Sequence, residues 1–194
     1  VTIDSSGNVG IGVTPENSSG TWRNFEQGGM NIAARSDGAI DGIVGTNYVF
    51  KTDNSEVYKN TGAASRLFFN DSVMQFQHAA SGTADTAITW SEAMRIDASG
   101  NVLVGKTVDT YGIEGFSIRG TPVSTQSIAT FTRDGDNVAA FNRLTSDGGI
   151  LAFAKDGTTV GSIGAYLGDL FISPTSDETR AMRMNSLGSV AVTG

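Results

Sequence analysis

The sequence contains no cysteine and a single histidine, and each shortage removes a class of function. Without cysteine, neither disulfides nor thiolate metal sites can hold the fold. With His78 as the only imidazole, one chain cannot form a catalytic triad or a multi-histidine metal site. No apolar run approaches the length of a membrane span, and the charges, which sum to −7, form no basic stripe. We therefore expect neither membrane insertion nor a nucleic-acid partner.

Large aliphatic residues and proline are also scarce, whereas glycine is abundant at 25 residues. Glycine, asparagine and aspartate tolerate the positive φ that tight hairpin turns need. No long segment shows the 3.6-residue apolar period of a helix. This composition predicts an all-β protein of short strands joined by tight turns.

One motif occurs three times along the chain. The copies read VTIDSSGNVGIGVTP at 1–15, AMRIDASGNVLVGKT at 93–107 and AMRMNSLGSVAVTG at 181–194. Apolar residues alternate with polar ones on both sides of a turn that holds a shared glycine, namely Gly7, Gly100 or Gly188. Alternation around such a turn predicts a β-hairpin, with these structural turn glycines at positive φ.

The spacing of the motif divides the chain into modules of similar length. We expect a first module at 1–92 (hairpin 1–14 plus a variable segment), a second at 93–180 (hairpin 93–107 plus a meander) and the start of a third at 181–194. The motif would then be the joint between modules. Strands are expected at Asn47–Lys51, Arg66–Phe69, Val73–His78, around Phe141, at Ile150–Ala154, from Val160 to Gly164 and at Leu170–Ile172.

Three stretches resemble bacteriophage tail fibres, notably those of marine and cyanobacterial phages. TAITWSEAMRIDASGNVLVGKT at Thr86–Thr107 resembles a linker motif that recurs in these fibres, and FNRLTSDGGILAFAKDGTTVGSIGAYLGDLFIS at Phe141–Ser173 is similar to them as well. The segment Asn47–Trp90, with GAASRLFF and FQHAASGTA, resembles the module that often precedes the motif.

This resemblance implies an elongated fibrous homotrimer of short antiparallel strands and β-hairpin repeats, located in the virion. It also implies a C-terminal intramolecular chaperone that is cleaved off; nothing here resembles one, so it would be removed or lie beyond Gly194. We expect the chain to be an ordered piece of a longer polypeptide. Trimerisation is also expected on physical grounds, because three chains around one axis would bury the apolar residues of thin sheets and pair their edges.

Several residues are candidates for chemistry or recognition. Met74, Phe76 and His78 share one strand face, so three copies of His78 on a trimer axis would be a candidate metal or anion site. Carboxylates lie close in sequence at Glu16 and Glu26, Asp134 and Asp136, and Asp177 and Glu178, but a turn role is favoured for them over glycosidase chemistry. The candidates for receptor contact are the aromatic residues Tyr111, Tyr166, Trp22 and Tyr48, whereas Trp90 is expected to pack beneath the hairpin.

The function predicted from these features is a structural, non-enzymatic segment of a tail fibre, with no catalytic residue and no cofactor. It would connect the virion to the host surface and support receptor attachment. The expected partners are further copies of the chain, other tail proteins and a host surface polysaccharide. Three alternatives remain: a receptor-binding tip for a host glycan, a depolymerase and a bacterial surface adhesin repeat.

Overall fold

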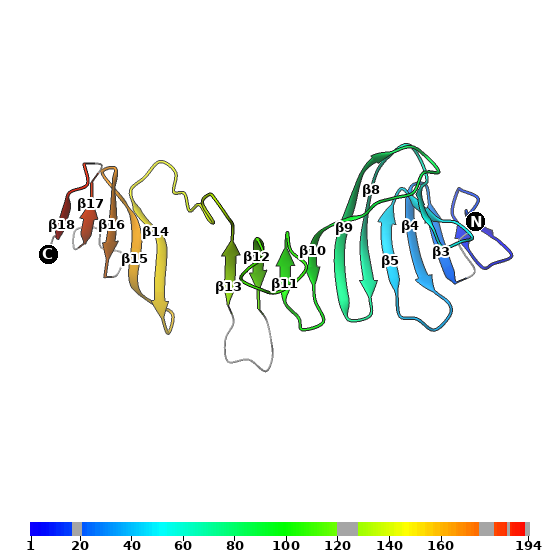
Figure 1. Ribbon diagram of the computed structural model, residues 1–194, viewed down its shortest axis with the longest axis horizontal. Coiled ribbons are helices and arrows are strands. Elements are labelled where there is room, and N and C mark those ends of the chain that lie inside the picture. The colour runs from blue at the N-terminus through cyan, green and yellow to red at the C-terminus, as the bar shows by residue number, and fades with distance from the viewer. Residues whose placement is uncertain (17–20, 120–127, 175–180, 186, 193–194) are drawn as a thin grey trace. The chain divides into compact units, whose positions relative to one another are not determined.

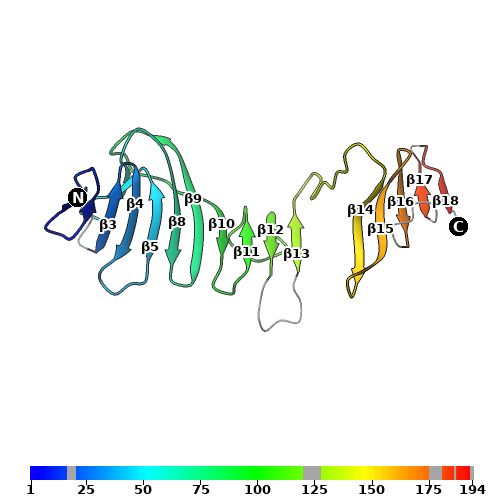
Figure 2. The ribbon, with the colours of Figure 1, turned by 180° about the vertical axis from the view of Figure 1, so that it is seen from behind.

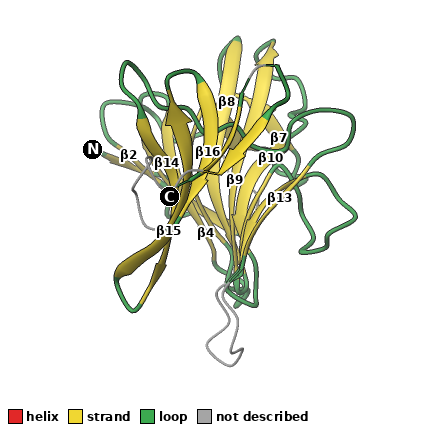
Figure 3. Cartoon of the chain, turned by 90° about the vertical axis from the view of Figure 1, so that its left-hand side faces the viewer, coloured by secondary structure: helices red, strands yellow, loops and turns green. Residues whose placement is uncertain are grey.

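Strands and turns make up the described chain. The computed structural model describes all residues except 17–20, 120–127, 175–180, 186 and 193–194. The described residues contain no helix (Figure 3). Accordingly, none of the described segments is a helix long and apolar enough to cross a membrane. The prediction of an all-β protein is confirmed.

The chain divides into two compact units, Val1–Val138 and Ala139–Gly194. The first unit is built on an eleven-stranded sheet, in which strands β3 to β5 and β8 to β13 lie side by side (Figure 1). All neighbouring strands in it are antiparallel, except β2 and β3. Its strands are β1 (Thr2–Ile3), β2 (Val9–Gly10), β3 (Trp22–Gln27), β4 (Met30–Arg35), β5 (Gly42–Thr46), β8 (Gly62–Asn70), β9 (Val73–Gly82), β10 (Ser91–Ile96), β11 (Val102–Val104), β12 (Gly115–Ile118) and β13 (Ala129–Thr132).

The boundary between the units corrects the predicted modules. The middle motif forms β10 and β11, but β10 also pairs with β9, and β11 also pairs with β12. The sheet therefore runs through this copy of the motif, and the division falls after Val138 instead of before Ala93. A hairpin hydrogen-bonded on both outer edges continues a sheet and does not separate two modules.

The second unit is a five-stranded antiparallel sheet with the strands in chain order (Figure 2). Its strands are β14 (Gly148–Lys155), β15 (Thr158–Tyr166), β16 (Asp169–Ser173), β17 (Met182–Met184) and β18 (Val190–Val192). The last copy of the motif forms β17 and β18, and β17 pairs with β16. It therefore completes this sheet, which corrects the expectation that it begins a third module.

All three copies of the motif form the same turn. The turn glycines have φ of 87°, 80° and 78°, and each donates its N–H to the carbonyl of the residue three positions earlier: Gly7 to Asp4, Gly100 to Asp97 and Gly188 to Asn185. The side-chain oxygen of that earlier residue accepts the backbone N–H groups two and four positions after it. The turn therefore satisfies its own backbone groups, and it needs only the glycine and an aspartate or asparagine three positions before it.

The predicted meander is present from Gly148 onward, but the strand expected around Phe141 is not. Phe141 lies outside any strand and is 59% exposed. Thr145 has a φ of 65°, a left-handed conformation that ends an extended segment. The guanidinium of Arg143 donates to the carbonyls of Ser146 and Gly149, which holds the segment in a loop.

The main core lies on one face of the first unit's sheet. The short hairpin of β6 (Tyr48–Phe50) and β7 (Glu56–Tyr58) forms a separate two-stranded sheet. Tyr48 and Phe50 pack against Trp22, Ala33 and Ile43 of the large sheet. Gly45 leaves room for the Tyr48 ring, since a Cβ there would lie 2.9 Å from Cε1 of Tyr48. This face is therefore covered by the chain itself.

Candidate functional site

An unbroken row of apolar side chains crosses the other face of the first unit's sheet. Strand pairing places one residue of each of the eleven strands opposite the next. In strand order the row is Ile3, Val9, Phe25, Ile32, Val44, Leu67, Phe76, Met94, Val104, Phe116 and Phe131. We call it the first ladder.

No residue of the first ladder is buried. Phe76 is 43% exposed, Phe131 is 50% exposed and Ile3 is 69% exposed, and the remaining members are exposed or half-buried. Scattered exposed apolar residues are normal on a protein surface, but a contiguous row is not. A contiguous apolar row of this length sets this face apart from an ordinary protein surface.

The second unit repeats this arrangement over its five strands. Its pairing aligns Leu151, Ile163, Ile172, Met182 and Val192, which we call the second ladder. Ile172, Met182 and Val192 are exposed, and Leu151 and Ile163 are half-buried. Each unit thus leaves an apolar row uncovered.

The opposite sheet face of the first unit combines the apolar core with buried polar groups. Glu26 is fully buried, and its carboxylate accepts a hydrogen bond from Nζ of Lys59 at 2.7 Å. Arg66 is paired with Glu56 at 2.6 Å. Asn31, on β4, is also buried. The chain therefore covers this mixed face with its own segments and leaves the face that carries the first ladder open.

His78 lies beside the first ladder, on the face that it shares with Met74 and Phe76, as the alternation predicts. Strand pairing sets it in a polar row with Thr46, Ser65 and Ser91. Within one chain, no group of three or more histidine, cysteine, aspartate or glutamate residues that could hold a metal ion occurs among the described residues. A metal site at His78 would need further copies of the chain.

Two of the four predicted receptor-contact residues lie in the core, which corrects the expectation for them. Trp22 is 6% exposed and stacks on Phe50 with ring centroids 4.6 Å apart. Tyr48 is fully buried, and this burial raises the pKa of its hydroxyl. Neither ring offers surface to a ligand. Trp22 packs under the β6–β7 hairpin and Tyr48 belongs to that hairpin, so both rings lie in the same core, where aromatic area stabilises the fold.

Tyr166 and Trp90 pack against arginine side chains. Tyr166 ends β15 and is half-buried, with the guanidinium of Arg183 lying 4.1 Å from its ring centroid. Trp90 packs against the core, and Arg66 lies 4.2 Å from its ring. Its indole N–H donates to Glu56. Trp90 therefore packs under the β6–β7 hairpin, which carries Glu56, and not under the repeated motif that was predicted to cover it.

Tyr111 is the exposed member of the four, at 59%. It lies in the loop between β11 and β12. The guanidinium of Arg119 lies 4.9 Å from its ring centroid, and Nη1 of Arg119 donates to its hydroxyl at 3.4 Å. The ring is thus held from one side by an arginine that follows β12.

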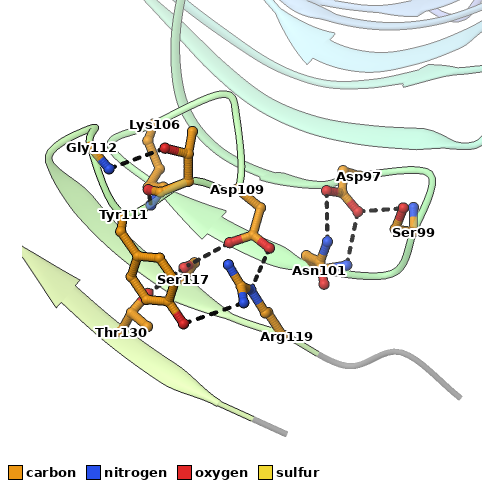
Figure 4. Close-up of polar contacts among 11 residues, drawn as sticks. Asp97, Ser99, Asn101, Lys106, Asp109, Tyr111, Gly112, Ser117, Arg119 and Thr130 are labelled. Atoms are coloured by element: carbon orange, nitrogen blue, oxygen red, sulfur yellow. Dashed lines mark hydrogen bonds and ion pairs between the residues drawn. The ribbon is translucent and has the colours of Figure 1, made fainter. Parts of the chain in front are cut away.

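A chain of hydrogen bonds fixes Arg119 in turn. Its Nε donates to Oδ2 of Asp109 at 2.6 Å, and this contact raises the pKa of the guanidinium. Oδ1 of Asp109 accepts from the hydroxyl of Ser117, which also bonds the hydroxyl of Thr130 at 2.6 Å (Figure 4). The Asp109 carboxylate thus ties the loop to β12, and Ser117 extends this link to β13.

The carboxylate pairs do not form a glycosidase-like site among the described residues. Glu26 is buried and bound to Lys59, and it also accepts the backbone N–H of Glu16 at 2.9 Å. Asp134 and Asp136 are both exposed in the loop after β13, and Asp136 pairs with Arg133. Asp177 and Glu178 lie outside the described residues.

Comparison with known protein families, with characterised proteins and with solved structures finds no match to this chain.

The two ladders and the Arg119–Tyr111 contact were not foreseen from the sequence. Alternation within each strand was visible, but the row exists only because the strands align in one particular register. An arginine eight residues after a loop tyrosine gives no signal of its own.

Proposed function

We propose that the chain is a structural, non-enzymatic segment of a homotrimeric phage tail fibre, part of the virion and linking it to the host surface. The observation that supports this most is the first ladder, an uncovered apolar row that crosses eleven strands. The resemblance of Thr86–Thr107 and Phe141–Ser173 to tail fibres points to the same kind of assembly.

The size of the first ladder favours association. A large apolar side chain that is about two-fifths exposed offers on the order of 80 Å². Six members of the ladder are exposed and five are half-buried, so together they offer roughly 500–700 Å² per chain, somewhat less than one side of a standard protein interface. At ~25 cal/mol per Å² the gross gain is about 12–17 kcal/mol per chain. This gain is comparable to the roughly 4–15 kcal/mol that association costs.

The narrowness of the apolar band favours three chains over two. In β9, only Met74 and Phe76 are large apolar residues on the open face, and His78 follows them. Two sheets stacked face to face would place Ser65 and His78 under the partner as well. If three sheets converge along the first ladder, they bury the ladder and leave the polar row that contains His78 at the edge of the interface.

The mass of the chain in solution tests this proposal. Sedimentation equilibrium of the whole chain should give three times its 20.2 kDa. Phe76→Asp would bring three carboxylates together in an apolar interface, so at micromolar concentration it should sediment as a monomer. A matched control is Ile40→Asp, because Ile40 is 69% exposed but lies in the loop between β4 and β5. A monomeric unmodified chain would contradict the proposal, as would equal effects of the two substitutions.

Tyr111 favours a second role within the same assembly, which is contact with a receptor. The tail-fibre proposal makes other tail proteins and a host surface polysaccharide the further partners. A receptor-binding segment differs from a passive shaft in that the isolated trimer binds host cells. Binding of the purified trimer to whole cells, followed by pelleting, separates the two.

A further inference from the structure

The loop between β11 and β12 presents three apolar side chains to solvent. Val108 is 53% exposed, Tyr111 is 59% exposed and Ile113 is 42% exposed. We call these three residues, together with Arg119, the tyrosine pad. The pad lies on the sheet face opposite the first ladder, because its loop contacts Ser117, whereas the neighbouring Phe116 belongs to the ladder.

The loop that carries the pad is anchored at several points. Lys106 is 6% exposed, and its Nζ donates to the carbonyl of Thr110 at 2.8 Å. The hydroxyl of Thr110 accepts the N–H of Gly112 at 3.1 Å. Asp109 binds both Arg119 and Ser117. These bonds fix the residues on both sides of Tyr111, so the ring is exposed and held at the same time (Figure 4).

Exposure combined with rigidity points to binding. An aromatic ring that stabilises a fold does so by being buried, as Trp22 and Tyr48 are. Holding a ring in water gains little for the fold, but it lowers the entropy lost when a ligand docks on it. A preorganised, exposed aromatic surface is therefore what a small binding site requires.

The charges at the pad define the ligand. The cation of Arg119 is balanced by Asp109 at 2.6 Å, so the pad favours neither a free anion nor a free cation. A wholly apolar ligand would cover the Tyr111 hydroxyl and the Arg119 guanidinium without bonding to them, which costs free energy. A sugar ring, which has an apolar face of C–H groups and hydroxyl groups around its edge, satisfies both conditions.

We propose that the tyrosine pad binds the ring of a neutral saccharide, which stacks on Tyr111 while its hydroxyl groups bond to Arg119 and the Tyr111 hydroxyl. The statement that the pad lies on the outside of the assembly rests on the proposed function, because it requires the first ladder to face inward. The saccharide site itself stands on the loop geometry of one chain.

Saturation-transfer difference NMR on the whole chain tests the site. The probes are the methyl glycosides of glucose, galactose and N-acetylglucosamine at millimolar concentration. At least one should receive saturation, and Tyr111→Ala should weaken its binding about tenfold. Tyr111→Phe keeps the stacking surface and should retain most of the binding. Phe141→Ala is the matched control, since Phe141 is also 59% exposed, and it should change nothing.

Two outcomes would overturn the proposal: no transfer to any of the three glycosides, or transfer that Tyr111→Ala and Phe141→Ala reduce equally. Sedimentation and thermal melting of each variant show whether it keeps its assembly and fold. A chain that is monomeric but shows Tyr111-dependent transfer would refute the trimer and keep the saccharide site. A trimer without such transfer would refute the saccharide site and keep the trimer.

Discussion

The two units of the chain cover their sheets to different extents. The first unit folds the β6–β7 hairpin over one face, so that Tyr48 and Phe50 of the hairpin are buried against Trp22 of the sheet. The second unit has five strands, and the large apolar residue buried in its described part is Phe171, beside small residues such as Ser162 and Ala181. Both leave one apolar ladder open. The first unit therefore has a core of its own, whereas the described part of the second unit buries little apolar area within one chain.

The largest expected effect comes from placing an aspartate in each ladder separately, which tests whether the two units differ in this way. Ile163→Asp, in the second ladder, should remove association there and unfold the sheet, because few large apolar residues of that unit are buried within one chain. We expect amide protection in β14–β16 to fall by roughly 100-fold or more. Phe76→Asp, in the first ladder, should leave slow-exchanging amides in β3 to β5. Hydrogen exchange read by mass spectrometry reports both units in one experiment.

Leu167→Asp is the control for the charge itself. Leu167 is 75% exposed in the turn between β15 and β16, at a φ of 54° that aspartate tolerates. It should not change protection in the second unit. Survival of slow exchange in β14–β16 after Ile163→Asp would show that the second unit is stable alone, and the contrast between the units would fail.

The core of the first unit gives the next largest effect. Trp22→Ala removes a ring that stacks on Phe50 and packs under the hairpin, so it should cost about 3–5 kcal/mol of that unit's stability. Urea unfolding followed by hydrogen exchange should show the loss in β3 to β5 and none in β14 to β16. Phe141→Ala, at an exposed loop position, should change stability by less than about 0.5 kcal/mol. An equal loss in both units would mean that they unfold as one.

Much of the local structure was predictable, because strands and turns follow from neighbouring residues. Asp156 and Gly157 between two apolar runs predict a hairpin, and both have positive φ there. The three turn glycines follow in the same way from the motif. The strand expected around Phe141 was wrong because Thr145 and Arg143 hold that segment in a loop, and nothing in its alternation shows this.

The ladders and the burial of the aromatic residues depend on contacts between distant segments. Met94 lies opposite Phe76 only because the pairing of β9 and β10 shifts between Glu92 and Met94. Without that irregularity the row would break at β10. Trp22 stands between Thr21 and Arg23, which is typical of a surface residue, and Tyr48 begins a short apolar run after Asn47 that could face either way. Their burial depends on a hairpin that folds back over the sheet, which no local pattern encodes.

The smallest expected effect concerns the two end hairpins, where the same turn is built with different chemistry. In the first unit, the side-chain amide of Asn8 donates to Asp4 and holds the pKa of that carboxyl below its usual value of 3.8. In the second unit, Asn185 holds the equivalent place and carries no titrating group. A carboxyl whose pKa is lowered by folding stabilises the folded form above its ordinary pKa, and this contribution disappears as the pH falls through the lowered value.

The β1–β2 hairpin should therefore loosen below about pH 3.8, while β17–β18 shows no such dependence from its turn. NMR titration of the Asp4 carboxyl carbon should give a midpoint below 3.8. The backbone amides of Ser6 and Asn8, which donate to the same carboxylate, should shift in step with it. Asp4→Asn copies the turn of the second unit and should abolish the pH dependence at Ser6 while keeping its hydrogen bond. If the amide shifts of Ser6 still titrated in that variant, another group would control the turn, and the difference between the two hairpins would not lie in this residue.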